Sequence, residues 1–201
     1  MSRRMIIGLT GNIATGKSAV MRLAAERGAL TIDADRVVHE LLDGDATIRA
    51  AVVDAFGPDV RRADGRIDRA ALGRIVFGDA ERLRALEGIL HPAARMEIAR
   101  RVAAAEAPVV MIEAIKLLEG PLAAVCDRIW VTNCARTTQM ARLQVCRGMD
   151  RATAAARIDA QPPQEEKIAR ADVVIHTDGP MSETEAQFEA AWTGLWDTND
   201  E

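Results

Sequence analysis

Short apolar runs alternate with longer stretches of helical periodicity along this chain of 201 residues. The runs are rich in β-branched residues and fall at residues 5–9, 30–32, 109–112, 129–131 and 173–175. Runs of this length and composition are typical of strands in a parallel sheet that is buried on both faces. The pattern predicts an α/β fold of three layers around a five-stranded parallel sheet.

Two helical regions interrupt this alternation. Residues 35–107 have helical periodicity and no convincing strand, and within them residues 68–77 have the apolar spacing of an amphipathic helix. Residues 135–170 are expected to form two helices with arginines near the turn between them, as suits a lid. We expect a single domain, with a core of 1–34, 108–134 and 171–201, an acceptor-binding insertion at 35–107 and a lid at 135–170.

The first predicted strand runs directly into a loop that fits the phosphate-binding pattern G-x-x-x-x-G-K-[ST]. Its residues are Gly11, Asn12, Ile13, Ala14, Thr15, Gly16, Lys17 and Ser18. In such a loop, backbone N–H groups surround phosphate oxygens, the lysine reaches the β- and γ-phosphates and the hydroxyl binds Mg²⁺. Residues 19–27 then predict a helix that ends at Gly28. The loop therefore predicts a bound nucleoside triphosphate, with Lys17 on phosphate and Ser18 on the metal.

Composition narrows the possible partners. The formal net charge is −4, aromatic residues make up 3% of the chain, and there is no Tyr. These values give little support for a nucleic-acid surface built on phosphate contacts and base stacking. No segment approaches the ~20 apolar residues of a membrane helix, and no secretory signal is visible, so we expect a cytoplasmic protein whose partner is a small molecule. We expect a monomer or a weak homo-oligomer.

The three cysteines, Cys126, Cys134 and Cys146, are odd in number and lack C-x-x-C spacing. This pattern argues against both a zinc site and a disulfide framework. We expect reduced, mostly buried thiols.

Asp33-Ala34-Asp35 follows the second predicted strand, where the carboxyl ends of parallel strands face a ligand crevice. A carboxylate there could accept the proton of an attacking hydroxyl group. It could instead cap the next helix, since Asp is a favoured N-cap residue. The residues alone leave Asp33 open between base and cap, and favour the cap for Asp35.

An ordered set of motifs over nearly the whole chain resembles the dephospho-CoA kinase family. The set comprises Gly8-Leu9-Thr10-Gly11, Asp33-Ala34-Asp35, Leu90-His91-Pro92, Arg142, Arg147, Gln161, Lys167 and Ala171-Asp172-Val173-Val174-Ile175. The resemblance implies transfer of the ATP γ-phosphoryl group, with Mg²⁺, to the ribose 3′-hydroxyl of dephospho-CoA, the last step of CoA synthesis. It also implies a fold like that of nucleoside-monophosphate kinases, with a core, a helical CoA-binding region and a lid.

The resemblance assigns roles to several of these residues. It makes Asp33 the group that orients and deprotonates the 3′-hydroxyl, and Arg142 and Arg147 lid residues. Arginines brought in by lid closure can stabilise the charge of a transferring phosphoryl group. The alternative is that these arginines, like Arg136 and Arg151, only solvate a helix face.

Four further positions are weaker candidates. The resemblance places His91 in the acceptor-binding region, although His91-Pro92 could equally be an ordinary first helical turn. It places Gly179 in a loop near the adenine of ATP. Lys116 follows the third strand and could face the phosphates of the acceptor or solvent, while Glu113 ends that strand and could hold a Mg²⁺-bound water or be structural.

The chain departs from the family pattern in its phosphate loop. Asn12, Ala14 and Thr15 stand where the commoner loop has Gly, Gly and Ser, all at variable positions of the pattern. Two alternatives to the family's reaction stay open. One is a kinase for another small acceptor, such as a nucleotide or a shikimate-like alcohol, and the other is a nucleotide-dependent switch protein.

Overall fold

The computed structural model describes residues 4–196. It contains one five-stranded parallel sheet in the order β2-β3-β1-β4-β5. The strands are β1 (Met5–Thr10), β2 (Leu30–Asp33), β3 (Val109–Glu113), β4 (Arg128–Asn133) and β5 (Val173–His176). All five predicted strands are confirmed, each one to three residues longer than its apolar run.

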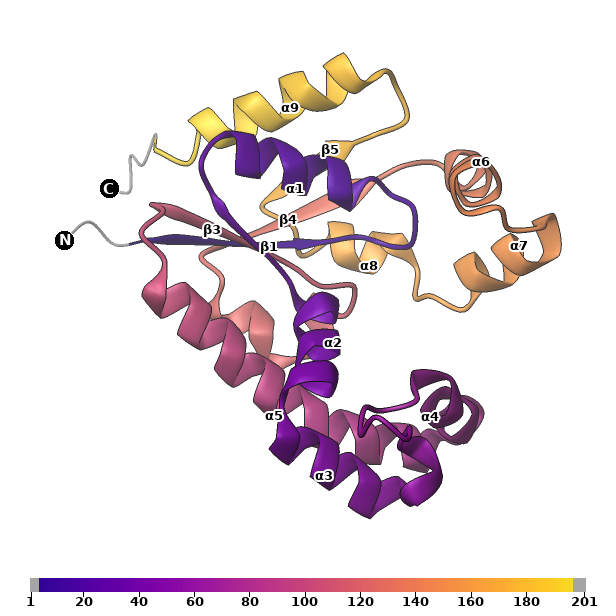
Figure 1. Ribbon diagram of the computed structural model, residues 1–201. Helices are drawn as coiled ribbons and strands as arrows, with labels where there is room; N and C mark the ends of the chain where they lie inside the picture. The colour runs from indigo at the N-terminus through magenta and orange to yellow at the C-terminus, as the bar shows by residue number, and fades with distance from the viewer. Residues whose placement is uncertain (1–3, 197–201) are drawn as a thin grey trace. The chain divides into compact units, whose positions relative to one another are not determined.

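The helices fill the intervals between the strands as the periodicity predicts (Figure 1). They are α1 (Lys17–Glu26), α2 (Ala34–Gly44), α3 (Ala46–Phe56), α4 (Arg69–Val76), α5 (Ala80–Ala104), α6 (Arg136–Arg147), α7 (Arg151–Asp159), α8 (Gln164–Ile168) and α9 (Met181–Thr193), with 3-10 turns η1 (Pro58–Val60), η2 (Leu117–Glu119) and η3 (Pro121–Val125). Helix α1 ends as expected, with Gly28 just beyond it.

Alternate residues of the strands build the core under α1 and α9. Ile7 and Leu9 of β1 point to this side and are fully buried, together with Trp130 of β4. The Trp130 ring meets Phe188 of α9 edge-on at a centroid distance of 5.8 Å, and Phe188 stacks on Trp192 at 5.4 Å. Figure 1 shows α1 and α9 on one side of the strands and α8 on the other, which gives the three predicted layers.

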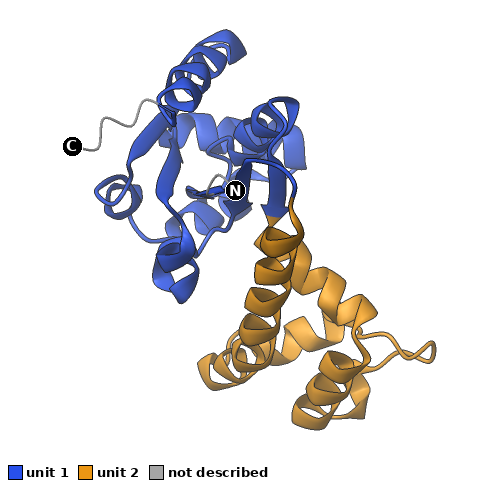
Figure 2. Cartoon of the chain, turned by 90° about the vertical axis from the view of Figure 1, so that its left-hand side faces the viewer, with its two compact units in different colours: residues 1–32, 106–201 blue, residues 33–105 orange. Residues whose placement is uncertain are grey.

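The chain divides into two compact units, shown in blue and orange in Figure 2. One unit contains Met1–Ile32 and Glu106–Glu201 and carries nearly all of the sheet. The other is Asp33–Ala105, whose described elements are helices and 3-10 turns around a separate apolar core. Val52, Val60 and Leu72 are among the buried residues of that core.

The structure contradicts the expectation that Asp35 caps the second helix. Helix α2 begins at Ala34, and Asp33 is its N-cap, accepting a hydrogen bond from Arg36 N at 3.0 Å. The strand passes into the helix with no intervening loop, so the last strand residue has the extended backbone that an N-cap needs. Asp35 lies in the first turn, where its charge is favourable to the helix dipole.

The alternative that His91-Pro92 opens a helix is also wrong. Both residues lie in the middle of the 25-residue helix α5, with Pro92 inside it. Proline lacks the N–H that would bond to the carbonyl four residues earlier. Packing against α2, α3 and α4 accounts for a helix that continues through this position.

The cysteines are free thiols, but only one of them is fully buried. Cys134 is buried, Cys126 is half-buried and Cys146 is exposed on α6. Burial raises the pKa of the Cys126 thiol to about 12. The expectation of mostly buried thiols is therefore wrong for Cys146.

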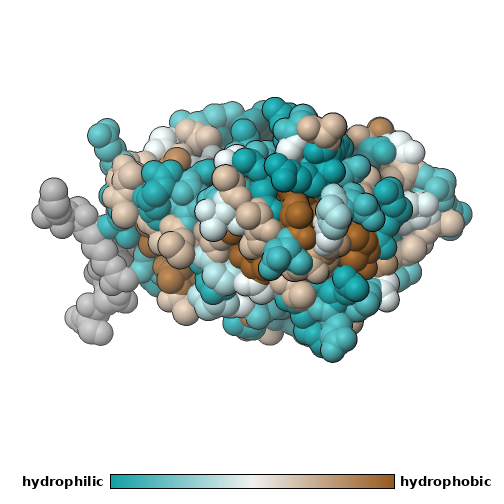
Figure 3. Space-filling view, turned by 60° about the horizontal axis from the view of Figure 1, so that its bottom comes forward, coloured by the Kyte–Doolittle hydropathy of each residue, from teal (hydrophilic) through white to brown (hydrophobic). Residues whose placement is uncertain are grey.

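Figure 3 shows one face on which hydrophobic side chains gather near the middle and hydrophilic side chains surround them. The large hydrophobic residues that stay exposed in the described part of the chain are Phe77, Met96, Val125, Val145 and Trp196. Within residues 4–196, no helix combines the length and the apolar character that crossing a membrane requires.

Candidate active site

The loop between β1 and α1 has the backbone of a phosphate cradle. Gly16 has a φ of 93° and precedes the first residue of α1, and Ala14 has a φ of 60°. These left-handed residues turn the chain sharply, so that peptide N–H groups can face inward at the positive end of α1. A Cβ atom on Gly11 would lie 2.5 Å from Thr132 Oγ1, so glycine is needed there for close approach to β4. The loop therefore fits a bound triphosphate.

Lys17 and Ser18 occupy the first turn of α1. The Lys17 ammonium donates to Gly11 O at 2.9 Å and to Asn12 O at 3.2 Å, and lies 3.9 Å from a carboxylate oxygen of Glu113. Lys17 is 7% exposed, whereas Ser18 is exposed. The ammonium is thus held over the loop, and a hydroxyl and a carboxylate supply the hard oxygen donors that Mg²⁺ prefers.

Helix α6 holds the middle of the loop, at Ile13 and Ala14, from one side. Gln139 Nε2 donates to Ile13 O at 2.7 Å, and Arg142 Nη1 donates to Ala14 O at 3.0 Å. The same arginine donates to Thr177 Oγ1 at 3.0 Å and to Thr177 O. Arg142 is half-buried. Its hydrogen bonds link the turn at Ala14, which has a positive φ, to Thr177 just after β5.

Helix α8 and the segment before it hold the start of the loop, at Asn12 and Ile13. Gln161 Oε1 accepts from Ile13 N at 2.6 Å, and Gln164 Oε1 accepts from Asn12 N at 2.9 Å. The Asn12 side chain donates to Pro162 O at 2.9 Å and accepts from Lys167 Nζ at 2.7 Å. The predicted lid, residues 135–170, therefore contacts the loop through polar side chains near the start and near the end of the lid.

Arg147 differs from Arg142 although both lie on α6. It is in the last helical turn and is exposed, and its side chain has no hydrogen bond or ion pair within residues 4–196. Arg136, at the other end of α6, forms a two-point ion pair with Asp159 of α7, with a shortest distance of 2.5 Å. Of these three arginines, Arg147 is the one whose guanidinium group is free to contact a ligand.

The other predicted residues of the sheet follow strand ends. Asp33 is the exposed last residue of β2, and Gly179 is exposed three residues beyond β5. Lys116 is exposed just before η2. Carboxyl ends of parallel strands share one edge of a sheet, so these positions follow the same edge as the phosphate loop.

His91 belongs to the helical unit and is exposed on α5.

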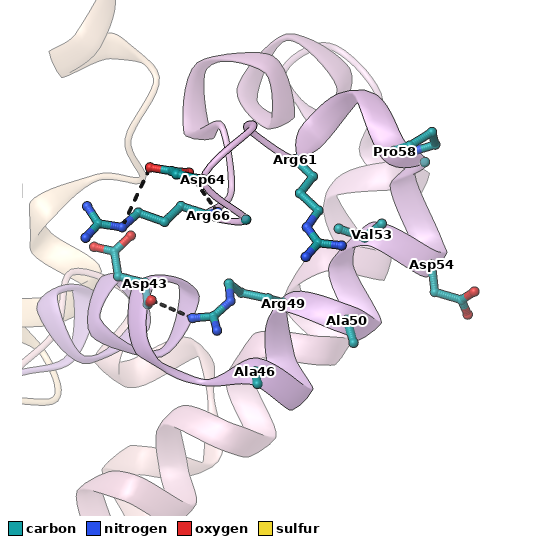
Figure 4. A pocket seen from close by; sticks show the side chains of 12 residues that line it. Asp43, Ala46, Arg49, Ala50, Val53, Asp54, Pro58, Arg61, Asp64 and Arg66 are labelled. Atoms are coloured by element: carbon teal, nitrogen blue, oxygen red, sulfur yellow. Dashed lines mark hydrogen bonds and ion pairs between the residues drawn. The ribbon is translucent and has the colours of Figure 1, made fainter.

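A pocket of about 840 Å³ lies within the helical unit (Figure 4). Arg49, Arg61 and Arg66 line it together with three aspartates. Arg49 donates to the carbonyl of Asp43 at 2.6 Å, and Arg66 lies 3.9 Å from the carboxylate of Asp64. Positive and negative side chains balance, so the charge of the pocket does not by itself select an anion.

The sequence patterns did not single out Gln139 and Gln164 among the side chains that hold the loop. Gln139, Gln164 and Thr177 contact it from positions more than 120 residues away in sequence. No spacing rule connects such positions, because the contacts depend on how α6, α8 and β5 are folded back onto β1. Burial of polar side chains is the structural signal, and Gln139 and Thr177 are 6% and 3% exposed.

A parallel sheet whose first strand leads into a glycine-rich loop ending in Lys17 and Ser18 defines a P-loop fold of the kinase type. The model of the dephospho-CoA kinase family matches residues 5–183. A dephospho-CoA kinase from Symbiobacterium thermophilum is 46% identical over 190 residues, which cover 93% of this chain and 80% of that protein. The chain belongs to the dephospho-CoA kinase family.

Solved structures share the fold of this chain. Protein TT1252 from Thermus thermophilus has a TM-score of 0.84 and 31% identity, with 96% of this chain and 99% of that chain covered. A shikimate kinase from Acinetobacter baumannii has a TM-score of 0.58 and 14% identity, with 98% and 96% covered, and shows the shared fold alone. P-loop kinases of this kind use ATP, typically with Mg²⁺.

Proposed function

We propose that the protein transfers the γ-phosphoryl group of ATP to the ribose 3′-hydroxyl of dephospho-CoA, giving CoA and ADP in the final step of CoA biosynthesis. Membership of the dephospho-CoA kinase family supports the acceptor. The observation that carries the donor side is the loop itself, in which the turns at Ala14 and Gly16 leave Lys17 and Ser18 at the start of α1.

The loop residues from Gly11 to Ser18 would hold the triphosphate of ATP, and Ser18 would bind Mg²⁺. Bound together, ATP and Mg²⁺ supply the transferable phosphoryl group and neutralise part of its charge. Lys17 would leave the carbonyls of Gly11 and Asn12, which it binds in this structure, for phosphate oxygens. Backbone carbonyls are weaker partners for an ammonium group than phosphate, so this exchange favours nucleotide binding.

Asp33 would accept the proton of the 3′-hydroxyl as that oxygen attacks the γ-phosphorus and the bond from the γ-phosphorus to the β-γ bridging oxygen breaks. Only Oδ1 of Asp33 is bonded to the backbone, through Arg36 N, and the carboxylate is exposed at the end of β2. The cap holds the side chain in place, since rotating it away would leave a helix N–H without an acceptor.

We place acceptor binding on His91 and Lys116 and a donor contact on the backbone of Gly179. All three are exposed in their own unit. Arg142 and Arg147 would supply positive charge to the transferring phosphoryl group, and Arg142 also holds the loop at Ala14 O. Closing residues 135–170 over the nucleotide would also exclude water, which favours transfer over hydrolysis.

The test is the reaction itself, followed with purified protein and Mg-ATP in the presence and absence of dephospho-CoA. We expect ADP and the 3′-phosphorylated product to form together, with little ADP when the acceptor is omitted. Faster turnover with a nucleotide or a shikimate-like alcohol would favour the alternative kinase. Slow hydrolysis that no acceptor accelerates would favour a switch protein.

Lys17→Ala is the variant that isolates the loop. Removing the ammonium should abolish ATP-dependent turnover while the fold, followed by circular dichroism, is retained. Unchanged kinetics would refute the assignment of the loop.

We also propose that the protein acts in the cytoplasm as a monomer or weak homo-oligomer on this small-molecule substrate.

A further inference from the structure

Every polar atom of Asn12 takes part in a hydrogen bond, and two of these hydrogen bonds go to lysines, one to Lys167 and one to Lys17. Its side-chain Oδ1 accepts from Lys167 Nζ at 2.7 Å, and its backbone oxygen accepts from Lys17 Nζ at 3.2 Å and from Thr15 Oγ1 at 2.8 Å. Its N–H and its Nδ2 donate to Gln164 Oε1 and Pro162 O. The residue after Gly11 therefore lies between α8 and the lysine that reaches phosphate.

Both partners of the side-chain contact are buried. Asn12 is 6% exposed and Lys167 is 4% exposed. An ammonium group out of water is costly unless hydrogen bonds satisfy it, and burial lowers the pKa of Lys167. The nearby charge of Glu119 opposes that shift. Losing the hydrogen bond from Lys167 to the amide oxygen is therefore unfavourable, because it would leave a buried charge without an acceptor.

We propose that Lys167 is a positioning residue for ATP binding, which acts through the side chain of Asn12 to fix the first half of the phosphate loop. The tie fixes Asn12 against α8, and with it the neighbouring amide of Ile13 where it meets Gln161. With the first half fixed, the N–H groups of the second half keep the inward turn that Ala14 and Gly16 create. This inference rests on the proposed function only in taking ATP as the ligand of the loop.

The test is a double-mutant cycle with Asn12→Ala, Lys167→Met and the two combined. Methionine replaces the unbranched part of the lysine side chain and lacks the ammonium group. ATP affinity is measured by titration calorimetry without acceptor, well below the melting temperature of each variant. Each single substitution should weaken ATP binding about tenfold. The double variant should bind ATP no more weakly than the single variant with the lower affinity, because all three variants lose the same Lys167–Asn12 hydrogen bond.

Steady-state kinetics provide a second readout. The KM for ATP should rise in the single variants while the KM for dephospho-CoA stays unchanged. Glu165→Gln is the matched control, because Glu165 is exposed on the same short helix α8, and it should bind ATP as the unmodified protein does. If Lys167→Met does not fold, Asn12→Ala alone tests the tie through the same two KM values.

Two results would overturn the inference. One is a fall in melting temperature with ATP affinity within twofold of the unmodified protein, which would make the tie purely structural. The other is a double variant whose loss equals the product of the single losses. Lys17→Ala separates this inference from the proposed function. If this variant binds ATP normally, the assignment of the loop as the ATP site fails. If the unmodified protein binds ATP but does not phosphorylate dephospho-CoA, only the assignment of the acceptor fails.

Discussion

The Asp33 carboxylate has two roles, as the N-cap of α2 and as the proposed general base. One oxygen accepts the N–H of Arg36 and caps α2, and the proposed reaction needs the group to take a proton from the acceptor hydroxyl. The two roles are compatible, because a carboxylate has two oxygens and about four lone-pair sites. They also make a substitution at this position informative, since asparagine keeps the cap and loses the base.

For Asp33→Asn we therefore expect a folded protein with very low turnover. Asparagine caps helices about as well as aspartate, so the melting temperature should change little. A positioned general base contributes about 10²- to 10⁴-fold, so kcat with dephospho-CoA should fall by at least about 10²-fold. Calorimetry and steady-state kinetics provide the two measurements.

Asp45→Asn is the matched control. Asp45 caps α3 through the N–H groups of Thr47 and Ile48 and has no proposed part in catalysis. It should leave kcat unchanged. Near-normal kcat for Asp33→Asn would show that another group takes the proton.

At the scale of elements, α6 carries arginines in different states. Arg147 is unpaired within the described residues, and Arg136 is held by Asp159. We expect Arg147→Ala to lower kcat by about tenfold or more, because charge delivered to a transferring phosphoryl group acts mainly in the transition state. Arg136→Ala, which removes an exposed ion pair, should change both kcat and stability little. Equal effects of the two substitutions on kcat would reject a specific role for Arg147.

Helices α2 and α5 are joined by a charge network. Arg101 donates to Glu97 at 2.8 Å and to Glu40 at 2.6 Å, and Arg100 also binds Glu97. Hydrogen bonds from Arg100 and Arg101 lower the pKa of Glu97 from 4.5 to about 2. A carboxyl group whose pKa is lower when folded stabilises the fold above its unfolded pKa, and this contribution disappears as the pH falls through the folded value.

Glu97→Gln should therefore destabilise the protein modestly at pH 7, by less than about 1 kcal/mol for such a partly exposed network. The difference from the unmodified protein should shrink as the pH falls from 4.5 toward 2. Urea unfolding at pH 7 and pH 3 measures it. A difference that does not depend on pH would mean that packing, not charge, is lost.

The strands and the phosphate loop could be predicted because their signals are local. Ile7 and Leu9 lie in an apolar run that only a buried strand explains, and the loop follows it at a fixed spacing. The base-or-cap choice at Asp33 could not be decided from sequence, because an aspartate at a strand end suits either role and α2 starts at Ala34, two residues before the pattern that begins at Arg36. His91-Pro92 was misplaced for a related reason, since tertiary packing carried α5 through a proline that local rules place near a helix start.

The candidate site was predictable only in part. The phosphate loop is one short motif, but the side chains that support it make contacts over long sequence separations. Lys167 shows the difference, since its place in the sequence pattern was noticed while its bond to Asn12, 155 residues away, was not. Such contacts appear only when the chain is folded.

For the whole molecule, nucleotide binding should appear as added stability. A ligand that binds only the folded state stabilises it by about 2.7 kcal/mol at one hundred times its dissociation constant. Mg-ATP should therefore raise the melting temperature of the protein but not that of Lys17→Ala. An equal rise in both would mean that ATP binds elsewhere.

The stacked rings of the sheet unit give the protein a built-in optical label. All three tryptophans, Trp130, Trp192 and Trp196, belong to that unit. The chain has no tyrosine, and phenylalanine is the only one of Phe, Trp and Tyr in the helical unit. Emission excited at tryptophan wavelengths therefore reports the sheet unit alone, while far-ultraviolet dichroism is weighted toward helices of both units. If the two units unfold together, the two signals should change at one denaturant concentration; if the helical unit melts first, dichroism will fall while the emission stays native.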